Sequence, residues 1–80
     1  MTVRVRFFAS YADRLGRSEI ALELPAGSTV DDVIASVSAL PGATSLPPQP
    51  LIAVNLAYAR PSTALTDGDE IAFIPPVAGG

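Results

Sequence analysis

Residues 67–80 read DGDEIAFIPPVAGG, and this stretch indicates how the fold ends. Its first glycine supplies the positive φ of a tight turn. Residues 70–74 then place large apolar side chains at alternate positions, as a strand does. Pro75 and Pro76 lack N–H groups, so they end the strand and send the chain outward. We therefore predict a last strand followed by an arm, residues 75–80, that would reach roughly 18 Å at about 3.1 Å per residue.

Gly79 and Gly80 end the sequence, and neither has a Cβ atom. A Gly-Gly end can enter a channel that is too narrow for other backbones, and it can adopt dihedral angles that are closed to other residues. A frayed terminus is the alternative interpretation, because last residues are often disordered. The strand, the diproline and the sharp turn before the glycines favour a functional tail that presents a carboxylate on Gly80.

Residues 67–80 resemble the C-terminal signature of the small subunit of molybdopterin synthase, a family of ubiquitin-like sulfur carriers. Three earlier segments are also similar to that family, namely VRFFA at 5–9, LG at 15–16 and VN at 54–55. Nearly the whole chain is covered by these ordered matches. Related carriers that serve thiazole or cysteine synthesis share the Gly-Gly end, whereas Pro-Pro-Val before it is associated with the molybdopterin branch.

The resemblance implies an α+β fold, the ubiquitin-like β-grasp, in which one main helix covers a mixed sheet. It also implies that residues 1–74 form the β-grasp domain and that residues 75–80 form a flexible reactive tail. We expect no internal repeat and no further domain boundary.

Apolar alternation predicts strands, and helical spacing of apolar residues predicts helices. Thr29 or Ser28 can cap the main helix, which has two aspartates in its first turn and should stop at Pro41-Gly42. Residues 43–50 contain three prolines and should form an ordered loop over the edge of the sheet. The stripe that should cover the sheet is Val30, Val33, Ile34, Val37 and Leu40. The other predicted elements are a short helix at 9–14, stopped by Gly16, and strands at 3–8, 19–24, 51–55, 58–59 and 70–74.

The resemblance implies a chemical cycle at Gly80. An ATP-using, ubiquitin-activating-like adenylyltransferase adenylates the carboxylate, and sulfide from a persulfide displaces AMP to leave a thiocarboxylate. The sulfur then passes to a pyranopterin precursor in the large subunit of molybdopterin synthase, a heterotetramer. That subunit is expected to supply the catalytic residues, so this chain would be a non-catalytic sulfur donor with no permanently bound cofactor. Gly79 gives passage, and the residues that set reach and direction are Pro75, Pro76, Val77 and Ala78.

Three other functions stay open from the sequence. The adenylated Gly80 could pass to a lysine of another protein as an isopeptide, as in a ubiquitin-like protein modifier. The chain could instead carry sulfur for thiazole or cysteine synthesis, or it could be a passive interaction domain with an inert tail. Carriers and modifiers both need the Gly-Gly end, so the fate of the acyl group distinguishes them.

The composition bounds the class of protein. Eighty residues make one small domain, and a hydrophobic content of 49% with a mean hydropathy of +0.39 indicates that some apolar surface meets a partner. The net charge is −3 and the five basic residues are scattered arginines, so nucleic-acid binding is not expected. No apolar run approaches about 20 residues and the start lacks the apolar core of a signal peptide, which predicts a cytoplasmic protein without a membrane span.

Cysteine, histidine and lysine are absent from the sequence. The usual ligands of zinc and iron–sulfur sites are therefore missing, as is a side chain with an unperturbed pKa near neutrality. Asp67, Asp69 and Glu70 share one turn that lacks the ligand loop of a calcium site, so no metal site is expected. The absence of lysine removes amines that would intercept an activated Gly80, although codon usage in a GC-rich genome explains it as well.

Strand parity predicts an apolar patch on the open face of the sheet. Side chains alternate faces along a strand, so Phe8 and Ile74 should point away from the main helix. Arg4 and Arg6 share that face and should be solvated. Neighbouring first and last strands, as in a β-grasp fold, would place Phe8 beside Ile74, and Tyr58 could join them. We expect this exposed patch to dock partner enzymes beside the tail; a local twist that tucks one residue into the core is the alternative.

Overall fold

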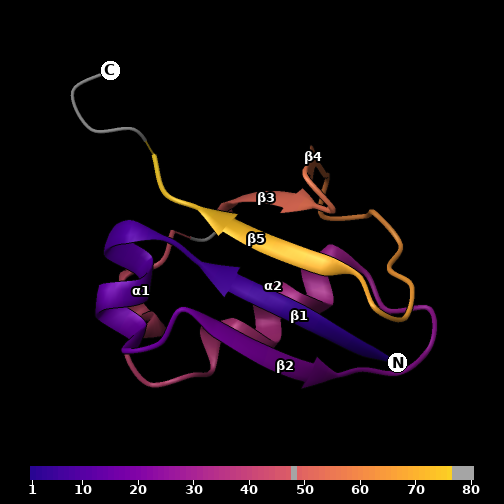
Figure 1. The fold of residues 1–80 in the computed structure, drawn as a ribbon, viewed down its shortest axis with the longest axis horizontal. Helices are drawn as coiled ribbons and strands as arrows, with labels where there is room; N and C mark the ends of the chain where they lie inside the picture. The colour runs from indigo at the N-terminus through magenta and orange to yellow at the C-terminus, as the bar shows by residue number, and fades with distance from the viewer. Residues whose placement is uncertain (48, 77–80) are drawn as a thin grey trace.

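The computed structural model describes residues 1–47 and 49–76 and is shown in Figure 1. In chain order it contains β1 (Thr2–Phe7), α1 (Ala9–Leu15), β2 (Glu19–Glu23), α2 (Val30–Ser38), the 3-10 turn η1 (Ala43–Ser45), β3 (Leu51–Val54), β4 (Ala57–Tyr58) and β5 (Glu70–Ile74). The strands lie in front of α2 in this view, and α1 lies at one end of the sheet. Strands and helices thus follow the order that the sequence predicts.

The sheet is mixed, with the strand order β2-β1-β5-β3-β4. The first strand, β1, and the last, β5, lie side by side and parallel, in a register that pairs Val5 with Ile71 and Phe7 with Phe73. β2 pairs antiparallel with β1, and β3 pairs antiparallel with both β5 and β4. The chain therefore leaves the sheet from an interior strand that is hydrogen-bonded on both sides.

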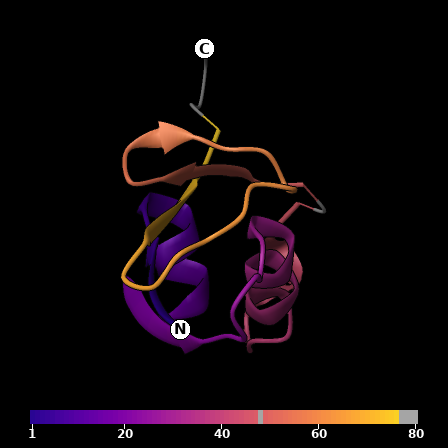
Figure 2. The same cartoon turned by 90° about the vertical axis from the view of Figure 1, so that its right-hand side faces the viewer.

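The core lies between the sheet and α2, which covers one face and leaves the other open (Figure 2). The side chains with no exposed surface are Val3, Val5, Val30, Val33, Val37, Ile71 and Phe73. Ile34 and Leu40 pack against this core from its edge and are half-buried. The rings of Phe7 and Phe73 lie 5.4 Å apart between centroids at a tilt of 56°, which is a favourable aromatic geometry. The predicted helical stripe is confirmed.

The main helix begins where predicted and ends earlier. Thr29 is the N-cap, and its backbone N–H donates to the Asp32 carboxylate at 2.8 Å, the return half of a capping box. The last helical residue is Ser38, so the predicted stop at Pro41-Gly42 was too late. The Leu40 N–H donates to the Val37 carbonyl at 3.0 Å, three residues back, because the last turn tightens before the prolyl residue.

The connection after α2, predicted as an ordered loop, contains the 3-10 turn η1. Gly42 turns the chain into η1 with a φ of +86°, and a Cβ atom there would clash with the Arg14 carbonyl oxygen. Only glycine allows this close approach to α1. Ala43 is buried in the core, so the connection packs against the domain.

Small shifts separate the other predicted elements from the observed ones. α1 ends at Gly16, whose φ is +73° and whose N–H donates to the Ala12 carbonyl, as predicted. β3 ends at Val54 rather than residue 55, because Asn55 has a φ of +50° and has left the extended region. β4 is Ala57–Tyr58 rather than residues 58–59.

Candidate functional site

The root of the tail lies at the end of β5. Ile74 is the last strand residue, Pro75 is half-buried and Pro76 is exposed. A surface hollow of about 310 Å³ separates this root from α1, and it is lined by Ser10, Tyr11, Arg14, Pro47 and Pro76. The other predicted tail residues, Val77, Ala78, Gly79 and Gly80, lie outside the described residues.

An apolar group lies on the open face beside this root, and we call it the docking patch: Phe8, Leu51, Tyr58 and Ile74. The exposed fractions of the first three are 41%, 49% and 75%. Leu51 is the direct cross-strand partner of Ile74, and Tyr58 is the partner of Ala53, so these side chains share one face of the sheet. Phe8 follows β1 and caps α1, where the next residue, Ala9, turns the chain with a φ of +47°.

The prediction for this face is confirmed for Phe8, whose side chain is exposed. Ile74 is half-buried, so the expectation that it is substantially exposed was wrong in degree. Its direct neighbour across the strand pair is Leu51, which adds apolar cover on the same face. Sequence reasoning missed Leu51, although the alternation from Leu51 through the buried Ile52 carries the necessary parity signal.

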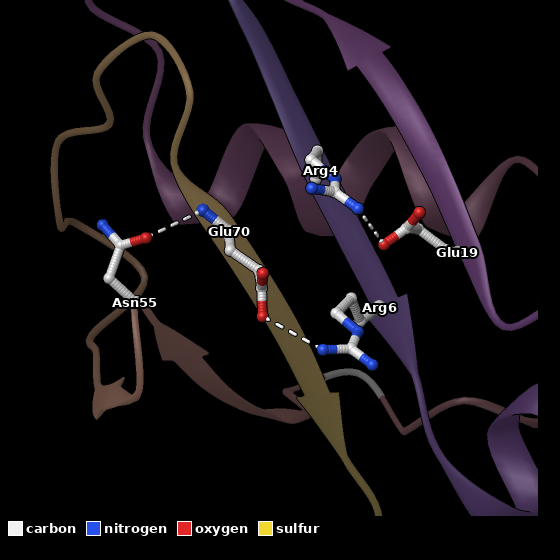
Figure 3. A network of polar contacts seen from close by, with 5 residues as sticks. All are labelled: Arg4, Arg6, Glu19, Asn55 and Glu70. Atoms are coloured by element: carbon white, nitrogen blue, oxygen red, sulfur yellow. Dashed lines mark hydrogen bonds and ion pairs between the residues drawn. The ribbon is translucent and has the colours of Figure 1, made fainter.

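The part of the open face that lies away from the docking patch carries charged side chains. Figure 3 shows Arg4 directed at Glu19 of β2 and Arg6 directed at Glu70 of β5, with N–O distances of 2.9 and 3.4 Å. The Arg6 guanidinium also lies 5.4 Å from the centroid of the Phe8 ring. The pairs are largely exposed and contribute little to stability, but they leave Arg6 at the border between the apolar and charged parts of this face.

The Asp69 carboxylate fastens the turn before β5 to the β3–β4 hairpin. It accepts the Thr66 N–H at 2.8 Å, the Thr66 hydroxyl at 3.0 Å and the Asn55 side-chain amide at 2.9 Å. The Asn55 amide oxygen in turn accepts the Glu70 N–H at 3.0 Å (Figure 3). These donors, first among them the Thr66 backbone, lower the pKa of Asp69 below its ordinary value of 3.8, against the opposing effect of burial.

The acidic turn is a structural element in this fold. The carboxylate of Asp67 accepts the Thr2 backbone N–H at 2.8 Å, while Asp69 and Glu70 are engaged as described above. Within residues 1–47 and 49–76, no group of three or more metal-ligating side chains is positioned to hold an ion. The same ranges contain no helix with the length and apolar content needed to cross a membrane.

Comparison of the amino-acid sequence with known proteins identifies the family of this chain. The family model described as "ThiS family" matches residues 5–80. The chain belongs to the ThiS family. It is 37% identical over 83 residues to the molybdopterin synthase sulfur carrier subunit of Chlamydomonas reinhardtii, and the match covers 100% of both chains. The resemblance drawn from residues 67–80 is thereby confirmed.

Solved structures of the same fold show the β-grasp arrangement. SAMP1 from Haloferax volcanii, a small archaeal modifier protein, superposes with a TM-score of 0.87 at 28% identity over 100% of both chains. A complex of subunits 1 and 2 of molybdopterin-converting factor from Helicobacter pylori contains a chain with a TM-score of 0.76 at 27% identity, again over 100% of both chains. The predicted α+β, ubiquitin-like β-grasp fold is therefore confirmed.

Proposed function

We propose that this chain is the sulfur carrier subunit of a molybdopterin synthase. The observation that carries the proposal is the end-to-end similarity to sulfur carrier subunits of that enzyme, which includes the Gly-Gly end. The geometry supports it, because the tail leaves from an interior strand beside the docking patch. A partner that covers the patch would hold the root of the tail at a defined position.

The chemistry at Gly80 begins from an unreactive group. A C-terminal carboxylate with a pKa of about 3.3–3.7 is ionised at neutral pH, and its charge repels nucleophiles. In the proposed cycle, a carboxylate oxygen attacks the α-phosphorus of ATP and pyrophosphate leaves. The outer sulfur of a persulfide then adds to the carbonyl carbon, and AMP leaves with the carboxylate oxygen that attacked ATP. A thiol then reduces the resulting acyl disulfide, which releases the thiocarboxylate and leaves the two remaining sulfurs joined as a disulfide. The product is a thiocarboxylate whose sulfur is a nucleophile for the next enzyme.

The partner is proposed to be the large subunit of the synthase, with an adenylyltransferase as the earlier partner. The Helicobacter pylori neighbour is a complex of subunits 1 and 2 of molybdopterin-converting factor, which supports an assembly of two different subunits here. Phe8, Leu51 and Tyr58 are the exposed anchors that such a partner would cover. Burial of each large apolar side chain stabilises a complex by about 1.5–3 kcal/mol. The Gly80 carboxylate, reached through Gly79, is the reacting group that this chain would supply, and the partner would provide the other catalytic residues and bind the pyranopterin precursor.

A second candidate function is protein modification through the same activated Gly80. The superposition on a small archaeal modifier protein favours this alternative specifically. The two functions differ in the fate of the acyl carbon, which ends as a thiocarboxylate in a carrier and as an isopeptide in a modifier. A carrier for thiazole or cysteine synthesis would form the same thiocarboxylate and differ in its acceptor.

The deciding experiment is intact-mass analysis of the chain isolated from its native host, followed by reconstitution with the large subunit from the same genome. A carrier should show a fraction in which one oxygen of Gly80 is replaced by sulfur, and that fraction should support dithiolene formation with the large subunit. Covalent adducts to lysines of other proteins, without the sulfur-bearing form, would contradict the proposal and support the modifier. A sulfur-bearing form that is inactive with the large subunit would indicate another pathway.

A further inference from the structure

The two-residue loop between β3 and β4 holds a leucine in an unfavourable conformation. Val54 pairs with Ala57, so Asn55 and Leu56 alone make the turn. Their φ angles are +50° and +72°. Positive φ at both central positions is the mark of a type I′ hairpin turn, which favours asparagine first and glycine second.

Asn55 suits its position and Leu56 does not. Asparagine tolerates the left-handed region, and the Asn55 side chain also bonds with Asp69 and with the Glu70 N–H. A leucine Cβ is crowded by its own backbone at this φ, and the side chain has no polar atom to bond with the turn. Leu56 is 95% exposed, so burial in the free domain does not offset the strain. Glycine would fit this loop better, and something other than stability accounts for the leucine.

Leu56 borders the same open face that carries the docking patch. It lines a hollow of about 430 Å³ together with Arg6, Asn55 and Glu70. Arg6 and Glu70 belong to the charged part of the open face (Figure 3), so the hollow continues that face towards the hairpin turn. Asn55 and Glu70 meet at the start of β5, and the docking patch lies at its end. The separation along the strand, residues 70 to 74, is roughly 13 Å at about 3.3 Å per residue.

We propose that Leu56 is a second anchor for the partner that receives the docking patch. Its isobutyl group would enter an apolar recess of that protein, with polar groups beside the recess to meet the Arg6–Glu70 pair. One partner can reach both anchors, because an interface of ordinary size covers about 800 Å² on each side. This inference rests on the proposed function, which makes that partner the large synthase subunit. Leu56 is therefore a specificity-determining contact that is retained against backbone strain.

The test uses Leu56→Gly, for which stability and binding should change in opposite directions. Relief of the strained φ should raise the thermal unfolding midpoint of the isolated chain by a few degrees, about 4–8 °C for a domain of this size. Affinity for the large subunit, measured by calorimetry, should fall about tenfold or more, because the buried leucine is lost. Leu56→Met is the matched control, because it keeps the strain and an apolar side chain of similar volume. Its unfolding midpoint and its affinity for the large subunit should both stay near those of the unmodified chain.

Each other outcome overturns a distinct statement. Unchanged affinity in Leu56→Gly, with tight binding by the unmodified chain, would remove Leu56 from the interface and leave the proposed function intact. A lower unfolding midpoint in Leu56→Gly would contradict the strain that motivates the inference. A self-association that disappears in Leu56→Gly would make a second copy of this chain the occupant instead. Failure of the unmodified chain to bind the large subunit would overturn the proposed function itself.

Discussion

Successive side chains along each strand point alternately to the face that α2 covers and to the open face. The two faces differ in what they contact. On β5, Ile71 and Phe73 are buried beneath α2, whereas Ala72 and Ile74 face the other way and are half-buried. The covered face is apolar throughout, and the open face is divided into charged pairs and the docking patch. Burial on one face accounts for the fold, and the apolar residues left on the other face remain available to a partner.

The largest effect should come from a change in the tail, which leaves the sheet beside the docking patch of the open face. Deletion of Gly80 would move the carboxylate back by about 3.3–3.6 Å. Because a misplacement of about 1 Å can cost about a hundredfold in rate, adenylation and sulfur transfer should fall close to background. ATP–pyrophosphate exchange with the activating enzyme measures the first step. Near-normal exchange by the truncated chain would contradict the proposed carrier function. As a control, the thermal unfolding of the truncated chain should be unchanged.

The next largest effect should come from the covered face. Val33 has no exposed surface, so Val33→Asp would bury an unpaired charge and should cost several kcal/mol of unfolding free energy. Urea denaturation followed by circular dichroism measures it. Ala35→Asp, on the exposed side of the same helix, is the matched control and should be nearly neutral. Equal stability of the two variants would show that α2 does not cover the core.

A smaller effect, confined to binding, should follow from a change in the docking patch. Leu51→Lys should weaken the complex with the large subunit by about 1.5–3 kcal/mol, or roughly tenfold to a hundredfold in Kd, while the domain stays folded. Ile74→Lys should act in the same direction, with some loss of stability because Ile74 is half-buried. Ala21→Lys, an exposed position on the other edge of the open face, should bind normally. If Leu51→Lys instead lost folding stability while its affinity for the large subunit stayed intact, Leu51 would contribute to the fold and not to docking. The contrast between the two faces would then be wrong.

The smallest effect concerns the turn before β5, which Asp69 fastens to the β3–β4 hairpin. Because the pKa of Asp69 is lowered in the folded state, its contribution to stability is fully present above its ordinary value of 3.8 and is lost as the pH falls through the lower folded value. Asp69→Asn should therefore lower the unfolding midpoint at neutral pH, and the difference from the unmodified chain should shrink in strong acid. Asp13→Asn on the surface of α1 controls for general charge effects. A difference that is independent of pH would assign the role to packing and not to charge.

Much of the fold was predictable because local chemistry and tertiary packing agree. Apolar spacing located the stripe on α2, Gly16 marked the end of α1, and the two prolines marked the end of β5. The errors include the end of α2 and the connection that follows it, where a tighter last turn and a close approach to α1 decide the outcome. The last turn of α2 tightens before Pro41, and Gly42 brings η1 against Arg14, a contact that no local pattern reveals.

The candidate site was predicted in part for the same reason. Parity placed Phe8 and Ile74 on the open face, and the alternation through Ile52 carried the same signal for Leu51. That Leu51 lies beside Ile74 follows only from the register between β3 and β5, which is a tertiary property. Parity also could not assign Leu56 a positive φ, since the two-residue loop follows from the pairing of Val54 with Ala57. Cross-strand pairing therefore decided which side chain lies beside Leu51 and which residues form the β3–β4 turn.

The sequence alone determined the element types, the helical stripe, the turn at Gly68 and the Gly-Gly end, because each depends on the covalent chemistry and spacing of neighbouring residues. Only the tertiary structure decided which apolar residues stay exposed, how far Ile74 is covered and why Asn55 is bonded to both Asp69 and Glu70. Exposure and hydrogen bonding depend on which distant strand lies alongside, and that choice is made by burial of the whole covered face at once.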